Sequence, residues 1–235
     1  MLAAASVQAQ RIKDAFEVGP NVYVRALTVE PSRNALWVGT SAGVHEVDLA
    51  SGKLRNTFTR KHGLANEYVF AVGLDRDGHK WFGTNAGGVS RYKDGKWKTF
   101  FPMHGLADYW IYSFAEQKSG DFWIGTWAGV NKLDAKTGKM VWSKAVGDSK
   151  ALQYITLAPL AAKGKIMVGS SGGETGVRGF VVALDAQTGN EAWRTFTTAA
   201  PGEPGGDTWA GDTHKNGGGT VWITGTYDPA TNLAY

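Results

Sequence analysis

The chain has 235 residues, of which 43% are hydrophobic, so it can bury a sizeable core and is not a disordered chain. Its 32 glycines and only 7 prolines are typical of short strands joined by frequent turns, and this composition predicts an all-β fold. No apolar run reaches about 18 residues, which excludes a membrane-spanning helix, and the lack of cysteine excludes disulfides and thiolate metal sites.

The net charge of +4 raises the question of a nucleic-acid partner. The densest basic stretch, residues 91–98, spans a predicted hairpin turn in which charged and aromatic residues alternate. This alternation is typical of the solvated outer face of strands and not of a track for phosphates. We therefore expect no nucleic-acid partner.

Residues 1–10 are small and apolar, and they contain Val7-Gln8-Ala9, which is compatible with signal-peptidase cleavage after Ala9. We interpret this segment as the remnant of a signal peptide, with an ordinary N-terminal tail as the alternative. The interpretation predicts a periplasmic or secreted protein.

An internal repeat follows. Three near-copies share the pattern Trp-x-Gly-Thr-x-Ala-Gly and occupy residues 36–44, 80–89 and 122–130, at spacings of 42 to 44 residues. This period is the length of a four-stranded propeller blade. His62-Gly-Leu-Ala and His104-Gly-Leu-Ala precede further matching segments at equal offsets, which supports the same register.

Each unit contains an alternating strand, a polar turn, a Trp strand ending in Gly-Thr, and a hairpin. The sequence therefore predicts one continuous all-β domain of β-propeller-type blades, each a four-stranded antiparallel sheet, with about four full blades and a partial fifth. Such an array is either incomplete or closed by oligomerisation, because blades bury their faces only against neighbours. Trp37, Trp81 and Trp123 occupy equivalent positions and are predicted to be packing residues.

The three repeats resemble the two-component regulator propeller family over about residues 21–139, within a first segment of residues 11–139. In that family, blades of this kind form extracytoplasmic sensory regions that bind ligands or partners. The resemblance implies a binding role here, with a small-molecule ligand or a protein partner whose identity the sequence leaves open.

Residues 140–235 follow a different pattern, which includes Gly-Gly-Glu at 172–174, the segment 183–193 with Ala-Leu-Asp-Ala-Gln-Thr-Gly, and Gly-Thr-Val-Trp at 219–222. This series resembles the PQQ-dependent alcohol dehydrogenases, which are quinoproteins. Both parts of the chain share a turn of the form Asp-x-x-Thr/Ser-Gly, at residues 48–52, 134–138 and 185–189. A change of family at residues 134–139 would preserve this hairpin, and we interpret the chain as a composite that was engineered, assembled or evolved.

The second resemblance implies a partial site for PQQ and Ca²⁺. It places Glu174 as a calcium ligand, since Ca²⁺ prefers oxygen ligands. The residues that it places around the quinone are Thr156, Ser171, Gly172, Gly173, Thr220 and Trp222. Each of these also has a structural interpretation: Trp222 as blade core and Glu174 as a solvated loop acid. Arg178 is predicted to be structural, and the five histidines share no metal-ligand spacing.

No catalytic residue is assigned, because the family's second calcium ligand and its catalytic Asp would follow after residue 235. A single carboxylate falls short of the six to eight oxygens that Ca²⁺ takes, so weak binding without turnover is expected. The sequence thus predicts an extracytoplasmic propeller binding or scaffold module, with a second copy as one means of completing the ring. The alternatives are a fragment of a PQQ-dependent alcohol dehydrogenase that oxidises an alcohol by hydride transfer to PQQ, and a chimeric propeller without physiological function.

Overall fold

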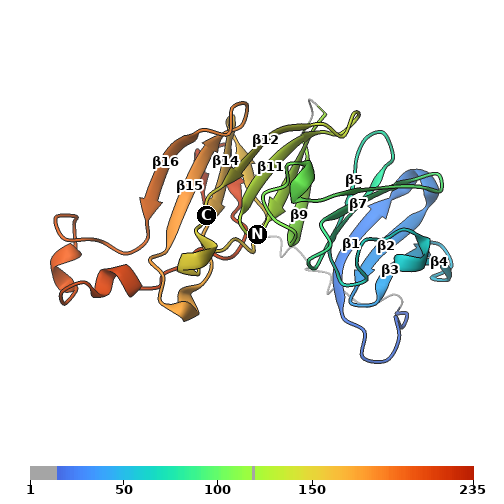
Figure 1. Ribbon diagram of the computed structural model, residues 1–235, viewed down its shortest axis with the longest axis horizontal. Coiled ribbons are helices and arrows are strands. Elements are labelled where there is room, and N and C mark those ends of the chain that lie inside the picture. Colours follow the sequence, from blue (N-terminus) through green and yellow to red (C-terminus); the bar gives the residue numbers. More distant parts are fainter. Residues whose placement is uncertain (1–14, 118–119) are drawn as a thin grey trace, which may run out of the picture.

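The computed structural model describes residues 15–117 and 120–235, and the predicted signal-peptide remnant lies outside these residues. The described part contains four four-stranded antiparallel sheets and one two-stranded sheet. In Figure 1 the four large sheets follow one another in chain order, from β1 to β4 in blue to β13 to β16 in orange. The predicted array of four full blades and a partial fifth is confirmed.

Within each blade, strands adjacent in the chain pair in antiparallel fashion. Blade 1 consists of β1 (Val24–Glu30), β2 (Ala35–Thr40), β3 (Gly43–Asp48) and β4 (Leu54–Phe58). Blade 2 consists of β5 (Val69–Leu74), β6 (Lys80–Thr84), β7 (Val89–Lys93) and β8 (Lys96–Phe100). Blade 3 consists of β9 (Ile111–Glu116), β10 (Asp121–Thr126), β11 (Gly129–Asp134) and β12 (Met140–Ala145). Blade 4 consists of β13 (Leu160–Ala162), β14 (Lys165–Gly169), β15 (Phe180–Asp185) and β16 (Glu191–Phe196). The first strands of blades 1 to 3 lie against one another, β1 on β5 and β5 on β9.

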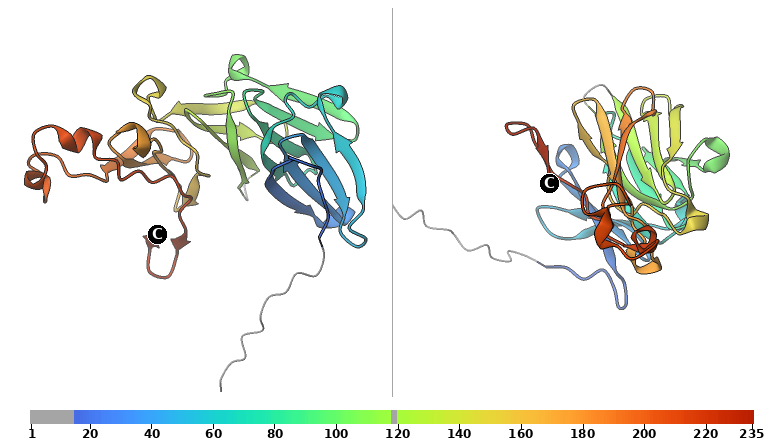
Figure 2. Two further views of the ribbon diagram at one scale, coloured as in Figure 1. Left: turned by 90° about the horizontal axis from the view of Figure 1, so that it is seen from below. Right: turned by 90° about the vertical axis from the view of Figure 1, so that its left-hand side faces the viewer.

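The segment after blade 4 is mostly irregular and ends in a hairpin of β17 (Tyr227–Asp228) and β18 (Leu233–Ala234). Figure 2 shows much of this red segment reaching beyond blade 4. The remaining helical elements of the described chain are short 3₁₀ turns: η1 (Pro31–Arg33), η2 (Arg60–His62), η3 (Pro102–His104), η4 (Ser149–Ala151), η5 (Gly173–Thr175), η6 (Gly206–Thr208) and η7 (Thr213–Asn216).

The Trp-x-Gly-Thr repeat explains how the blades are built. The three tryptophans of the repeat are buried, as predicted: Trp37, Trp81 and Trp123. The threonine side chain closes the hairpin that follows, because its hydroxyl donates to a backbone carbonyl across the turn at 2.9 to 3.0 Å. The pairs are Thr40 to Gly43, Thr84 to Gly88 and Thr126 to Gly129.

The glycine of the same motif permits close contact between blades. A Cβ on Gly83 would lie 2.7 Å from Ile111 Cγ2 in the first strand of blade 3, and a Cβ on Gly39 would lie 2.8 Å from Val72 Cγ2 in blade 2. A Cβ on Gly169 of blade 4 would likewise lie too close to Val221, at 2.6 Å from its Cβ atom. Val221 therefore stands where the first strand of a fifth blade would run.

The hydrophobic core is divided into three clusters, and each cluster combines residues of successive blades. Trp37 packs with Val69 and Phe82, which joins blades 1 and 2. The second cluster joins Trp81 of blade 2 to Ile111 of blade 3 and its neighbours. The third cluster joins blades 3 and 4.

The outer hairpins of both parts of the chain use the same turn. The Asp48 Oδ1 atom accepts hydrogen bonds from the backbone N–H groups of Ala50 and Ser51, at 3.0 and 2.8 Å. Asp185 accepts in the same way from Gln187 and Thr188, at 3.0 Å each. The turn predicted for both repeat types therefore has the same geometry in each.

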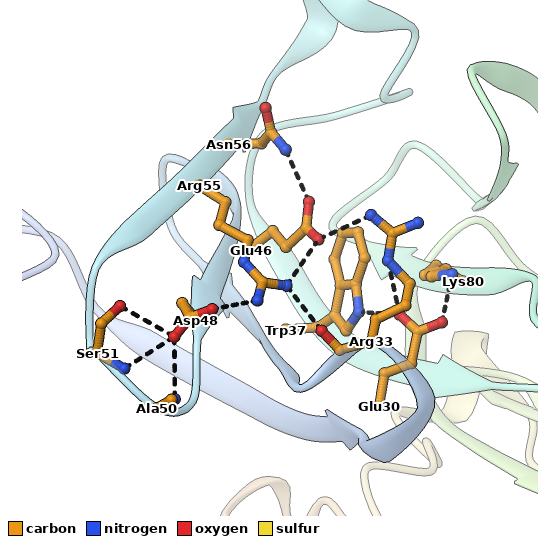
Figure 3. A network of polar contacts seen from close by, with 10 residues as sticks. All are labelled: Glu30, Arg33, Trp37, Glu46, Asp48, Ala50, Ser51, Arg55, Asn56 and Lys80. Atoms are coloured by element: carbon orange, nitrogen blue, oxygen red, sulfur yellow. Dashed lines mark hydrogen bonds and ion pairs between the residues drawn. The ribbon is translucent and has the colours of Figure 1, made fainter.

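A buried ion pair also joins blades 1 and 2 (Figure 3). The Lys80 Nζ atom lies 2.7 Å from Glu30 Oε1, and the other oxygen of Glu30 accepts from Trp37 Nε1 at 2.8 Å. Arg33 lies at the outer side of this group, with its Nε atom 3.8 Å from Glu30. The carboxylate of Glu30 is thus fully engaged at the contact of two blades.

Candidate functional site

All seven sequence-predicted site residues line a single pocket of about 510 Å³. Trp127 and Tyr154, which the sequence analysis did not assign, complete the lining. Trp127 follows β10 of blade 3, and Tyr154 and Thr156 precede β13 of blade 4. The remaining residues come from the loop after β14 and from the segment beside blade 4: Ser171, Gly172, Gly173, Glu174, Thr220 and Trp222.

Two glycines allow the loop after β14 to form this wall. Gly172 has φ +94°, a left-handed conformation that favours glycine, and a Cβ there would lie 2.5 Å from the Leu152 carbonyl oxygen. A Cβ on Gly173 would lie 2.8 Å from Thr220 Oγ1. The loop is held by the Ser171 N–H, which donates to the Tyr154 carbonyl at 2.7 Å. Close backbone approach therefore needs glycine at both positions.

Four polar side chains of the pocket are hydrogen-bonded in two pairs. The hydroxyls of Thr156 and Ser171 lie 2.6 Å apart. The Tyr154 hydroxyl donates to Glu174 Oε1. This hydrogen bond raises the pKa of the Tyr154 phenol and lowers the pKa of the Glu174 carboxyl, so Glu174 is ionised and Tyr154 protonated at neutral pH.

Aromatic side chains form the wall on the blade 3 side. The rings of Trp127 and Tyr154 are stacked, with centroids 4.1 Å apart and planes 8° from parallel. The stack continues from Trp127 to Tyr112 at 6.0 Å and from Tyr112 to Phe70 at 5.0 Å. Trp222 is different, because no ring of the described residues stacks on it and 60% of it is exposed.

These residues suit a planar quinone. The indole of Trp222 offers a flat apolar face, and three hydroxyls with two glycine backbones offer hydrogen bonds at the edge of a ring system. The geometry brings together the residues that the sequence had placed around the cofactor.

The same residues offer few carboxylate ligands for calcium. Across residues 15–117 and 120–235, no three His, Cys, Asp or Glu side chains gather closely enough to hold a metal ion. Glu174 is the one carboxylate among the residues that line the pocket, and its Oε1 atom accepts from Tyr154. Since Ca²⁺ takes six to eight oxygens, the carboxylate of Glu174 supplies at most two of them.

Other predictions can be compared with the structure. Arg178 has the structural role that we predicted: its guanidinium donates to the Thr198 carbonyl at 2.6 Å and lies 3.9 Å from the centroid of the Phe196 ring. The rings of His62 and His104 accept hydrogen bonds from backbone N–H groups, those of Thr59 and Phe101, at 3.0 Å each. These two histidines hold the turns η2 and η3.

Comparison with known proteins identifies relatives of part of the chain. Residues 149–235 match the family model for the β-propeller domain of glucose, ethanol and alcohol dehydrogenases, named PQQ. The quinohemoprotein alcohol dehydrogenase ADH IIB of Pseudomonas putida is 46% identical over 116 residues, covering 44% of this chain and 16% of the relative. Methanol dehydrogenase subunit 1 of Methylorubrum extorquens is 39% identical over 124 residues, covering 45% of this chain and 20% of the relative. The chain thus spans a fifth or less of the length of these relatives.

Solved structures resemble both parts of the chain. A europium-containing methanol dehydrogenase matches with a TM-score of 0.53 and 25% identity, covering 95% of this chain and 36% of that one. An extracellular domain ascribed to a hybrid two-component system of B. thetaiotaomicron matches with a TM-score of 0.62 and 19% identity, covering 94% of this chain and 27% of that one, which shows the fold alone. No helix among the described residues is long and apolar enough to cross a membrane. Residues 149–235 therefore match the PQQ dehydrogenase propeller model, and the chain shares its propeller-type fold with both solved structures.

Proposed function

We propose that the chain is an extracytoplasmic propeller module, periplasmic or secreted, that binds a planar quinone of the PQQ type in the pocket between blade 3, blade 4 and residues 220–222, without turnover. The observation that carries the proposal is the convergence of all seven predicted residues, which are up to 66 positions apart in the chain, on one pocket. The match of residues 149–235 to the PQQ dehydrogenase propeller supports the ligand class.

In this proposal Trp222 stacks on one face of the quinone, and Thr156, Ser171 and Thr220 hydrogen-bond its edge. Gly172 and Gly173 let the backbone approach the ring. When bound, the quinone supplies an acceptor for a hydride from an alcohol. Among the residues that line the pocket, Glu174 is the one side chain able to serve as a carboxylate base, and it is engaged by Tyr154. We therefore propose binding without turnover.

The test is a titration of the purified chain with PQQ and calcium chloride, followed by tryptophan fluorescence. We expect saturable quenching that is lost in Trp222→Ala and in the double variant Thr156→Val/Ser171→Ala. Trp193→Ala is the matched control, because Trp193 is also an exposed tryptophan, at 44%, but lines a different pocket. Equal quenching in wild type and Trp222→Ala would contradict the proposed site.

A second candidate function is that of a segment of a PQQ-dependent alcohol dehydrogenase, which the 46% identity to ADH IIB favours. A dye-linked assay of primary alcohol oxidation, run on the PQQ-loaded chain, separates the two candidates. Alcohol-dependent reduction of the dye would support the dehydrogenase, and quinone binding without dye reduction would support the binding module.

A further inference from the structure

The third blade departs from the others at the position that borders the pocket. In each blade, the residue after Gly-Thr or Gly-Ser donates its backbone N–H to a backbone carbonyl near the start of the same blade, at 2.7 to 2.9 Å. The accepting carbonyls belong to Tyr23, Tyr68, Trp110 and Tyr154. The four donors are Ser41, Asn85, Trp127 and Ser171. Three of these equivalent residues are small and polar, and the fourth is an indole that lies in the pocket wall.

This indole lies outside the segment that matches the dehydrogenase propeller, residues 149–235. It stacks on Tyr154, whose hydroxyl is bonded to Glu174. Trp127 and Tyr154 form a stacked aromatic wall, and the pocket lining contains a further indole, that of Trp222. A lining of this kind favours planar aromatic ligands.

The charge of the pocket lining is negative. Of the residues that line it, Glu174 alone carries a charge, and none is a lysine, arginine or histidine. The remaining polar groups of the lining are hydroxyls and backbone amides. A ligand with carboxylate groups would therefore meet a carboxylate and find no cation in the lining. PQQ carries three carboxylic acid groups, which are ionised at neutral pH.

We infer that this pocket binds planar ring compounds that are uncharged or positively charged more tightly than anionic compounds of the same shape. The inference rests on the proposed binding of a planar ligand in this pocket and names the charge class of that ligand. Trp127 is then a further binding residue, which the regulator-like blade contributes to the site.

The experiment uses isothermal titration calorimetry on the full chain, with PQQ and its trimethyl ester as a pair of similar shape that differs in charge. In the presence of a chelator we expect the ester to bind at least about fivefold more tightly than PQQ, since one contact of like charges at about 4 Å in water is worth about that factor. Calcium chloride or Glu174→Gln should narrow this difference. Trp127→Ala should weaken both ligands by about tenfold or more, and Trp127→Phe should restore most of the affinity.

A second pair of probes, N-methylacridinium and neutral acridine, makes the test independent of quinones. If neither quinone binds but the acridinium binds and is weakened by Glu174→Gln, the proposed quinone function fails and the charge preference stands. If PQQ binds as tightly as its ester in chelator, the inference is overturned while quinone binding stands. If no planar probe binds, or if Trp127→Ala leaves both affinities unchanged, the inference is likewise overturned. Circular dichroism checks that each variant is folded.

Discussion

Replacing Lys80 by leucine tests the contact between blades 1 and 2. Leucine and phenylalanine occupy the equivalent positions of the other repeats, at 36 and 122, so the β6 backbone accepts an apolar residue there. In this chain the Lys80 side chain is 6% exposed and that of its partner Glu30 is 8% exposed. Lys80→Leu therefore leaves a buried carboxylate without its cation.

The size of the effect follows from what Glu30 retains. Removing one partner of a buried ion pair costs about 3 to 5 kcal/mol. Glu30 keeps the hydrogen bond from Trp37 and the neighbouring Arg33, so we expect a loss near the lower end, about 3 kcal/mol of the free energy of unfolding. In the double variant Glu30→Gln/Lys80→Leu no buried charge is left, and the amide oxygen can still accept from Trp37. The double variant should lose only about 1 kcal/mol.

The measurement is urea unfolding of the wild type, both single variants and the double variant, monitored by tryptophan fluorescence and far-UV circular dichroism. The double variant should therefore be about 2 kcal/mol more stable than Lys80→Leu, and the double-mutant cycle should give a coupling of at least about 2 kcal/mol, because Glu30→Gln alone also leaves the buried Lys80 without its anion. A loss below about 1 kcal/mol for Lys80→Leu, or additive effects of the two changes, would refute the assignment of a desolvated pair that links the blades.

Two further predictions concern the repeat itself. Gly83→Ala should cost about 1 to 3 kcal/mol of stability in the same urea assay, because the new Cβ would meet Ile111 Cγ2 at 2.7 Å; an unchanged midpoint would contradict the close blade contact. In the turn of blade 1, hydrogen bonds from Ser51 and Arg55 lower the pKa of Asp48 from its ordinary value of 3.8 to about 2. Because folding lowers this pKa, the contribution of Asp48 to stability is present above pH 3.8 and is lost as the pH falls through about 2. Asp48→Asn lacks this contribution, so its acid unfolding should begin at a higher pH than that of the wild type. Carboxyl NMR titration gives the pKa of Asp48 directly.

Much of the architecture can be predicted from the sequence, because the blade motif acts locally. The buried Trp37, the closing Thr40 and the left-handed Gly52 (φ +66°) each satisfy a requirement of their own hairpin. The fourth blade lacks the tryptophan of the motif, yet the shared turn at residues 185–189 also indicates a hairpin, and the structure forms it between β15 and β16.

The candidate site could be predicted only in part. Its glycines, hydroxyls and Trp222 belong to one segment whose pattern resembles a known cofactor site. Trp127 belongs to the other repeat type, so no motif connects it to the pocket; its one signal is a tryptophan in a slot that holds serine or asparagine elsewhere. The bond between Tyr154 and Glu174 depends on the left-handed turn at Gly172, which brings residues 20 positions apart together. Such contacts depend on loop conformation, which local patterning does not specify.

The three hydrophobic clusters have a consequence for dynamics. Since each cluster is shared by two successive blades, an opening event that separates two blades exposes one cluster and leaves the other two intact. Amide hydrogen exchange should therefore report three separable opening free energies along the chain. A ligand between blades 3 and 4 would slow amide exchange in β10, β14 and β15 and leave the exchange rates in β2 and β6 unchanged. The pattern of exchange rates would therefore show which contact between blades the ligand stabilises.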